Sequence, residues 1–299
     1  MLWLLLAIAL VTIWATCIER FWFAIRTDSL EILPKGSKDI VVLHISDIHM
    51  APWQKRKQRW IATLAKKVSP DLVINTGDNL GHKLGIRPVL DSMQTLKGIP
   101  GVFVSGSNDL FAPVKRNPIA YLMHPSDRHR EQDLTAKLDT ETLNKGFIDL
   151  GWHNLNNSAA TIRINDVVLG FVGTDDPHEG RADLLATAES AKKISNRDFL
   201  IGVTHAPYLK VLTELHEIDS EVIFAGHTHG GQVCWPFIGR ALVTNCDLPT
   251  KYARGLHKVT IKGKEIILNV CAGLGNSIYA PVRLACRPEV RVITLKAKN

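Results

Sequence analysis

The chain has 299 residues, of which 45% are apolar and 22% are charged. This length and apolar content suffice to bury one large core in a single α/β domain, and the lack of internal repeats or low-complexity tracts excludes a repeat architecture. Lysine and arginine outnumber aspartate and glutamate by 36 to 29, which gives a net charge of +7. That balance is compatible with anionic lipid, nucleic acid or phosphorylated substrates, and equally with an ordinary basic surface.

The first feature along the chain is an uncharged apolar segment, residues 2–18. As a helix it would extend about 26 Å, near the lower limit for crossing a bilayer. Glu19 and Arg20 end the segment, and the aromatic residues 21–23 that follow are typical of a membrane interface. We therefore predict a single-pass membrane anchor over residues 1–26. A cleaved signal peptide is the alternative, although no basic residue precedes the segment and no small-residue cleavage site follows it.

The side of the membrane is left open by the sequence. Arg20, Arg26, Lys35 and Lys38 follow the anchor, and positive residues tend to stay on the cytoplasmic side. Residues 27–38 are predicted to be a linker and residues 39–299 the catalytic domain.

Residues 54–68 show helical periodicity, with Trp60, Ile61 and Leu64 on one face. The other faces are basic and carry Lys55, Arg56, Lys57, Arg59, Lys66 and Lys67. A solvated helix face is the simpler interpretation of this charge, and contact with anionic lipid is the alternative.

Five apolar runs each end at a group of polar residues. VVLHI leads into Asp47 and His49, DLVIN into Asp78, GVFV into Asn108 and Asp109, FLIGV into His205, and EVIFA into His227 and His229. Short apolar runs that close on Gly, Asn or Asp predict buried strands followed by loops. The polar residues should therefore gather along one edge of a sheet, where α/β folds bind ligands. Further strands are predicted at residues 159–164, 167–172, 255–261, 265–270 and 290–295.

These polar residues have the chemistry of a metal centre. Carboxylate, imidazole and amide groups together suit Mn, Fe or Zn. Residues two apart on an extended segment point the same way, so Asp47 and His49 can reach one ion. Asp78 can bridge two ions because a carboxylate has two oxygens. The candidate ligands are Asp47, His49, Asp78, Asn108, His205, His227 and His229.

The order of these motifs resembles the signature of the calcineurin-like metallophosphoesterases, which is D-x-H, G-D, G-N-H-[DE], H and G-H-x-H, each after a strand. The resemblance covers roughly residues 39–297, and the G-H-T-H-G-G-Q continuation is similar to a bacterial, membrane-anchored branch. It implies an α/β fold with four αββα layers, in which helices flank two packed mixed sheets. It also implies two divalent ions, one held by Asp47, His49, Asp78 and His229, and the other by Asp78, Asn108, His205 and His227.

One motif departs from the pattern. Where the family has Gly-Asn-His followed by an acid, this chain reads Gly106-Ser107-Asn108-Asp109. We predict Asn108 as the ligand; Ser107 is the alternative, but its hydroxyl is a poorer donor to a metal. Asp109 then occupies the position of the family's general acid. It could donate a proton if the site raised its pKa, whereas activated esters or diesters would need no acid, and metal-bound water could also serve as one.

The function implied is a membrane-anchored, dinuclear-metal phosphoesterase. It would hydrolyse phosphodiesters or phosphomonoesters by attack of a metal-bridging hydroxide, with Asn108, Asp109 and His205 as catalytic residues. The expected partners are a phosphate-ester substrate and membrane lipid, with lipid-linked or envelope molecules as candidate substrates. No nucleic acid is expected, because aromatic and basic residues do not interleave as in single-strand grooves. A non-catalytic metal-binding scaffold of the same fold is the alternative.

Three other segments allow two interpretations each. Residues 110–135 are irregular and could be a substrate cap or a connecting loop. Residues 175–178 (Asp-Asp-Pro-His) could be ligands but fit a turn better. Arg283 and Arg287 could bind phosphate or pair with an acid such as Glu289. The five scattered cysteines, and His44 within a strand, are predicted to be structural.

Overall fold

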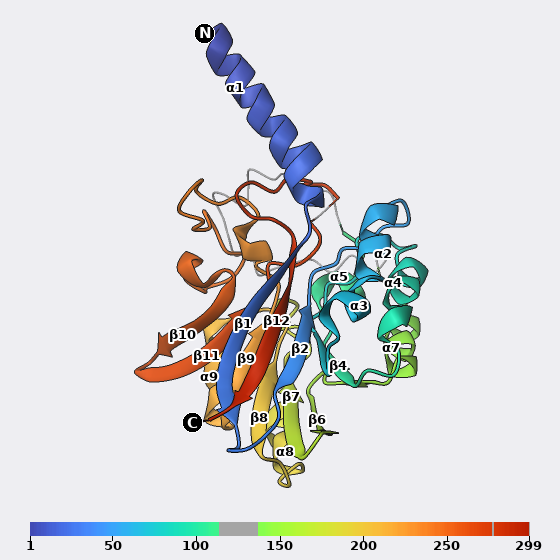
Figure 1. Ribbon diagram of the computed structural model, residues 1–299, viewed down its shortest axis with the longest axis vertical. Coiled ribbons are helices and arrows are strands. Elements are labelled where there is room, and N and C mark those ends of the chain that lie inside the picture. Colours follow the sequence, from blue (N-terminus) through green and yellow to red (C-terminus); the bar gives the residue numbers. More distant parts are fainter. Residues whose placement is uncertain (114–136, 277, 299) are drawn as a thin grey trace.

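The computed structural model describes residues 1–113, 137–276 and 278–298. Most of the predicted cap segment therefore lies outside the described residues. Within them the chain forms two six-stranded sheets packed face to face, with helices on both outer surfaces (Figure 1). This is the predicted αββα arrangement.

The first sheet has the order β1-β12-β2-β3-β4-β5. Strands β2 to β5 run parallel, and β12 is antiparallel to β2 but parallel to β1. Its strands are β1 Ala24–Leu33, β2 Ile40–Ile45, β3 Leu72–Asn75, β4 Gly101–Phe103, β5 Trp152–Asn154 and β12 Glu289–Ala297.

The second sheet has the order β10-β11-β9-β8-β7-β6, with antiparallel strands at both edges and parallel strands between them. Its strands are β6 Ser158–Ile164, β7 Val167–Gly173, β8 Phe199–Val203, β9 Ser220–Ala225, β10 Gly255–Ile261 and β11 Lys264–Val270. The five strands predicted over residues 159–295 are all present, with ends within two residues of those expected.

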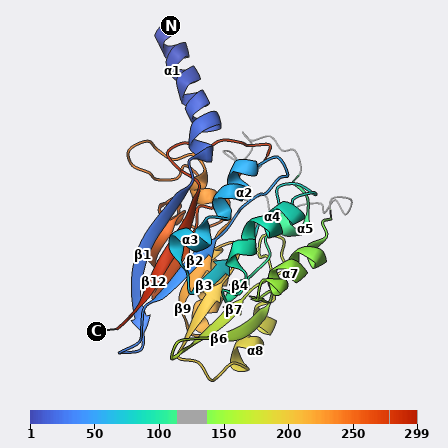
Figure 2. The ribbon, with the colours of Figure 1, turned by 45° about the vertical axis from the view of Figure 1, so that its right-hand side comes forward.

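The core lies between the sheets and on both outer faces. Val42 and Ile74 from the first sheet pack against Phe171, Ile201 and Phe224 from the second. Because both faces of each sheet are covered, the parallel strands are continuously apolar rather than alternating. Figures 1 and 2 show α2, α3, α4, α5 and α7 against the first sheet, and α8 at the end of the molecule far from α1, where it packs against β6 and β7 of the second sheet; α9 packs against β9. These helices are α2 Lys55–Ile61, α3 Leu64–Val68, α4 Ile86–Met93, α5 Ser107–Leu110, α7 Thr140–Asp149, α8 Leu184–Lys192 and α9 Leu209–Glu217.

The N-terminal segment projects away from the two sheets (Figure 1). Helix α1, Leu2–Ile13, continues through a π-helical turn, Trp14–Ile18, and a 3-10 turn, Glu19–Phe21. Together they make one helical stretch of 20 residues, Leu2–Phe21, that is long and apolar enough to cross a membrane. None of the α1 side chains is buried in the protein.

Two predictions about local structure need correction. Residues 27–38 do not form a linker throughout, because β1 runs to Leu33 and pairs with β12 along almost its whole length. The helix predicted over residues 54–68 is divided into α2 and α3 by a turn at residues 62–63. Lys57 is not on a solvated face; it is buried, and its ammonium donates to the carbonyl of Ile48 at 2.6 Å.

Candidate metal centre

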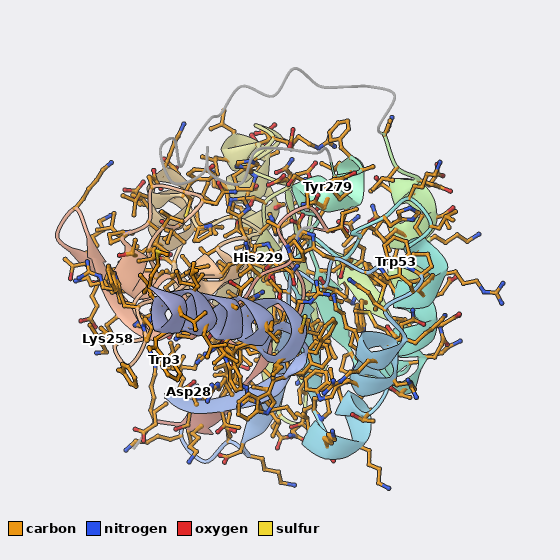
Figure 3. All side chains as sticks on the ribbon, turned by 90° about the horizontal axis from the view of Figure 1, so that it is seen from above. Trp3, Asp28, Trp53, His229, Lys258 and Tyr279 are labelled. Carbon is orange, nitrogen blue, oxygen red and sulfur yellow. The ribbon has the colours of Figure 1, made fainter. Side chains whose placement is uncertain are left out.

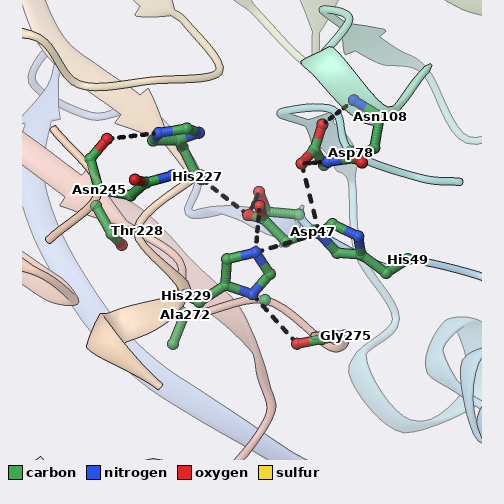
Figure 4. A network of polar contacts seen from close by, with 12 residues as sticks. Asp47, His49, Asp78, Asn108, His227, Thr228, His229, Asn245, Ala272 and Gly275 are labelled. Atoms are coloured by element: carbon green, nitrogen blue, oxygen red, sulfur yellow. Dashed lines mark hydrogen bonds and ion pairs between the residues drawn. The ribbon is translucent and has the colours of Figure 1, made fainter. Parts of the chain in front are cut away.

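The seven candidate ligands meet in one place, at the carboxyl ends of β2, β3, β4, β8 and β9. Figure 4 shows a close view of this network. Five of them, Asp47, His49, Asp78, His227 and His229, have positive φ angles between 44° and 67°. Non-glycine residues rarely adopt this left-handed conformation, and such strain collects at functional sites where the surrounding structure enforces it. The fold therefore bends the backbone so that these side chains face a common point.

The first cluster consists of Asp47, His49, Asp78 and His229, whose candidate ligand atoms all lie within 4.8 Å of one another. Nε2 of His49 lies 3.1 Å from Nε2 of His229 and 3.4 Å from Oδ2 of Asp78. Nε2 of His229 lies 3.5 Å from Oδ1 of Asp47, a buried oxygen without a hydrogen bond. Nδ1 of His229 is 3.2 Å from the carbonyl of Gly275, so it carries the proton and leaves the Nε2 lone pair facing the cluster.

The second cluster lies on the other side of Asp78. Oδ1 of Asp78 is 3.5 Å from Nε2 of His205, which is 3.2 Å from Nδ1 of His227. Nδ1 of His205 donates to the carbonyl of Thr76 at 2.7 Å, and Nε2 of His227 donates to that of Asn245 at 3.0 Å. These carbonyls orient both rings, so that once His205 is neutral, as metal binding requires, its Nε2 lone pair and that of His227 Nδ1 face each other beside a carboxylate oxygen.

Asn108 contacts the residue shared by both clusters. Its backbone N–H donates to Oδ1 of Asp78 at 2.8 Å, and its side-chain amide donates to Oδ2 at 2.6 Å. The backbone N–H of Asn108 thus contacts the Asp78 oxygen that faces His205, and its amide contacts the oxygen that faces His49. A half-turn of the amide would present its oxygen in place of its nitrogen.

Burial and neighbouring charges shift the pKa values of the two aspartates in opposite directions. Burial, reinforced by Asp78 but opposed by His205, raises the pKa of Asp47 to about 6. Burial alone would also raise the pKa of Asp78, but His205, His49 and the hydrogen bonds from Asn108 hold it below its usual value. Asp78 is therefore ionised, as a bridging ligand must be.

Burial and the same neighbouring charges also shift the pKa values of the four histidines. Burial alone would lower the pKa of His205, but Asp78, Asp47 and Asp176 raise it to about 9. Burial lowers the pKa of His49 to about 4 and lowers those of His227 and His229 as well. Three of the four imidazoles are thus neutral near pH 7, which is the form that binds metal.

Asp109, predicted as the proton donor, lies next to this centre with its carboxylate directed at the backbone. Oδ1 accepts from the N–H groups of Asn79 at 2.7 Å and Leu80 at 3.3 Å, and Oδ2 accepts from Gly106 N–H and the Asn79 amide, both at 3.1 Å. Burial, with a contribution from Asp78, raises its pKa to about 7. The carboxylate therefore ties the loop that carries Asp78 to the loop that carries Asn108.

Arg283 holds the loops behind the first cluster. Its buried guanidinium donates to the carbonyls of His229, Ala272, Gly273 and Gly275. It thus supports the first cluster through the backbone, rather than facing a phosphate or pairing with Glu289. Arg287 donates to the carbonyls of residues 22 and 23 instead.

Residues 175–178 follow β7 and lead into a turn at residues 177–180, closed by Gly180 N–H donating to the carbonyl of Pro177, and this segment also borders the second cluster. The ring of His178 lies 4.7 Å from that of His227, and its Nδ1 is 2.8 Å from the hydroxyl of Tyr208. His178 and Tyr208 line a cavity of about 340 Å³ beside the second cluster. The periodicity of the sequence could not reveal this proximity, because it depends on how β7 and β8 place their following loops.

A chain of buried hydrogen bonds joins the centre to the space between the sheets. Ser46 Oγ donates to Asp47, Thr76 Oγ1 donates to Ser46 at 2.7 Å, and His44 Nε2 meets Thr76 Oγ1 at 2.9 Å. The other ring nitrogen of His44 is 2.9 Å from the amide of Asn269 on β11. His44 is therefore a satisfied core residue, as predicted, and it links the two sheets.

The fold and this centre place the chain in a known class. The profile of the calcineurin-like phosphoesterases matches residues 40–231, so the chain belongs to that family and is a metal-dependent phosphoesterase.

Its relatives agree with this assignment. The Bacillus subtilis metallophosphoesterase YkoQ is 24% identical over 270 residues, covering 89% of this chain and 87% of its own. A zebrafish (Danio rerio) transmembrane protein with a metallophosphoesterase domain is 24% identical over 279 residues, and the match covers 89% of this chain and 55% of that protein. Among solved structures, a hypothetical protein from Thermus thermophilus aligns with a TM-score of 0.46 and 13% identity, over 80% of this chain and 81% of its own.

Proposed function

We propose that the chain is a membrane-anchored phosphoesterase that hydrolyses phosphodiesters or phosphomonoesters at two divalent metal ions. The observation that carries this proposal is the pair of clusters on either side of Asp78. Each brings imidazole lone pairs and a different oxygen of Asp78 to one point. Donors of this kind repel one another unless a cation or a proton lies between them.

The donor set fits two ions. The first would be held by Asp47, His49, Asp78 and His229, and the second by Asp78, Asn108, His205 and His227. Oδ1 of Asp47 supports the first site, since a buried carboxylate oxygen without a hydrogen bond is costly unless it binds a cation. Mixed oxygen and imidazole ligands favour Mn, Fe or Zn. When bound, the two ions would clamp the phosphate and supply a hydroxide nucleophile at neutral pH.

The chain's own residues hold these ligands in place. Carbonyls of Thr76, Gly275 and Asn245 set the imidazole tautomers, and Arg283 holds the loop of His229. For Asp109 we propose that it positions the Asp78 and Asn108 loops through its four accepted hydrogen bonds. The role predicted from the sequence, donation of a proton to the leaving group, requires the pKa near 7 that burial provides.

The substrate class is proposed from the N-terminal helix. Leu2–Phe21 is apolar and exposed, so anchoring in a bilayer would cover it. An anchored enzyme meets substrates at the membrane surface, which favours lipid-linked or envelope phosphate esters. A non-catalytic metal-binding scaffold is the alternative for the same donor set.

The proposal is tested with the purified full chain in detergent. Bound Mn, Fe and Zn are counted, and turnover of a chromogenic phosphodiester and a chromogenic phosphomonoester is measured with each metal. We expect about two ions per chain and turnover of at least one ester. Asp78→Asn should lose both ions and turnover, because Asp78 is shared.

The matched control is Asp71→Asn at the opposite end of β3, where the carboxylate accepts a hydrogen bond from Val41 N–H at 2.8 Å. This variant should keep both ions. Metal binding without turnover would favour the scaffold, and a chain that binds no metal would defeat both functions.

A further inference from the structure

We propose that the loop of residues 235–240 is a second membrane-contacting element, which inserts its tip into the bilayer beside the N-terminal helix. The inference rests on the membrane anchoring proposed above. It assigns a lipid-facing surface to the domain itself.

The loop exposes apolar side chains that a soluble surface would ordinarily cover. Trp235 is 57% exposed, Phe237 is fully exposed and Ile238 is 75% exposed. Three large apolar residues are thus exposed within four positions, and exposed apolar patches mark interaction sites for proteins or membranes. A Trp beside Phe and Ile has the composition of an interfacial membrane contact.

The patch is held in shape by its own backbone. Trp235 N–H donates to the carbonyl of Arg240, and Gly239 N–H donates to that of Trp235, both at 2.9 Å. Cys234 and Ala241 close the loop as an antiparallel bridge, and the guanidinium of Arg254 donates to the carbonyl of Gly239 at 3.1 Å. The side chains are thus presented by a closed hairpin rather than by a loose end of chain.

The hairpin is also tied to the base of the N-terminal helix. Cys234 N–H donates to the carbonyl of Leu284 at 2.9 Å, and the next two residues, Ala285 and Cys286, donate their N–H groups to the carboxylate of Glu19. Figure 1 shows these orange and red segments of the C-terminal third at the same end of the molecule as α1. The exposed tip and the apolar helix therefore lie on one side of the domain.

Aromatic residues at the helix base mark the level at which a bilayer surface would lie. Trp14 and Trp22 are 40% and 48% exposed, and their ring centroids are 6.0 Å apart. Glu19, whose carboxylate accepts the N–H groups of residues 285 and 286, also accepts from Trp14 Nε1 at 2.7 Å. A hairpin attached at this level can reach the interface without any change in the fold.

Charge complements the apolar tip. Arg240 closes the hairpin and Lys251 lies nearby, since Arg240 Nε donates to the hydroxyl of Thr250 at 3.2 Å. Both basic residues are exposed. Cations just behind an apolar tip are suited to anionic headgroups, which favours a bilayer over a second copy of this basic chain as the occupant.

The surface also bears on the candidate metal centre. The hairpin begins three residues after the 3-10 turn His229–Gly231, which carries a proposed ligand. In Figure 3, seen from the side of the N-terminal helix, His229 lies near the middle of the view. Docking of the hairpin would therefore hold the centre close to headgroup phosphates.

The test uses the full chain in proteoliposomes of phosphatidylcholine and phosphatidylglycerol. Ile238→Cys is labelled with an environment-sensitive fluorophore in a Cys17→Ser background, because the other four cysteines are buried. Leu185→Cys is the matched control: Leu185 is 80% exposed on α8, which Figure 1 shows at the far end from α1. Lipids brominated on their acyl chains quench only a probe that enters the bilayer.

We expect brominated lipid to remove about half of the fluorescence at position 238 and almost none at position 185. Adding Phe237→Asp should restore the emission at position 238. An unquenched probe on a chain that floats with the liposomes would overturn the inference and leave the anchor standing. If the probe emission also shifts in detergent, and the protein forms dimers there, the exposed apolar residues contact a second copy of the chain instead of lipid. A chain that does not float would overturn both the anchor and the inference.

Turnover of the chromogenic esters is measured in the same proteoliposomes. Quenching without turnover would support the membrane contact of residues 235–240 and count against the enzyme function. Turnover without quenching would support the enzyme and overturn the membrane contact of residues 235–240.

Discussion

The two sheets contribute different chemistry to the candidate centre. Loops of the first sheet supply both carboxylates, the amide of Asn108 and one imidazole, whereas loops of the second sheet supply the other three imidazoles. Asp78 alone has an oxygen in each cluster. Neither sheet can therefore form either cluster by itself. The centre forms only when packing of the two sheets brings their loops together.

After Asp78→Asn, the largest effect should come from removal of one imidazole supplied by the second sheet, and such a variant should distinguish the two clusters. We expect His229→Ala to lose the first ion and His227→Ala the second, so that each variant keeps about one ion. Turnover should fall more than about 100-fold in both, which exceeds the loss typical of residues that only support ligands. Metal counting on each variant checks this, and loss of both ions from both variants would show that the clusters are not independent.

A clash at the junction of the sheets should have the next largest effect. A Cβ at Gly226 would overlap Ser46 Oγ and lie 2.6 Å from Oδ2 of Asp47. We expect Gly226→Ala to lower the free energy of unfolding by about 1–3 kcal/mol and to weaken metal binding, because the loops must move apart.

Gly36→Ala is the control for this change. A Cβ at Gly36 would have no neighbouring atom within 4 Å, and the only penalty is the left-handed φ of 80°. Gly36→Ala should therefore lower the free energy of unfolding by about 1–2 kcal/mol without any effect on metal binding. Thermal unfolding and metal titration of both variants provide the measurements. Equal metal affinity in the two would contradict the proposed contact.

The smallest effect is expected at Asp109, in helix α5 after β4 of the first sheet. If its carboxylate positions the Asp78 and Asn108 loops, Asp109→Asn should lower turnover about tenfold for esters with good and poor leaving groups alike. If it donates a proton, only esters with poor leaving groups should slow down. The ratio of the two rates, compared with wild type, decides between these roles.

Much of the fold was predictable because short sequence patterns determine where most of the strands lie. Apolar runs predicted every strand of the two sheets except β1 and β5 to within about two residues, since a strand buried on both faces has a continuous apolar sequence. The segment at residues 27–33 was missed because the edge strand β1 mixes polar and apolar residues and half of its length is exposed.

The candidate centre was predictable only as a set of residues. The order D-x-H, G-D, Asn, H and G-H-x-H selected all seven candidates, and all seven lie at the shared edge. Whether each is a metal ligand stays a prediction that metal counting can test. The sequence could not foresee that Lys57 is buried or that His178 lies beside His227, because neither contact follows from the spacing of residues along one element.

Local sequence patterns were enough to identify the seven candidate ligands, the strands that precede them and the apolar helix at the N-terminus. Packing in three dimensions was needed to establish which oxygen of Asp78 faces which imidazoles, how Arg283 and Asp109 hold the ligand loops, and that the hairpin at residues 235–240 lies beside the N-terminal helix. The physical reason is that periodicity and turn chemistry act over a few residues. Contacts between sheets depend on packing among segments as far apart as residues 47 and 227, and no local pattern encodes that distance.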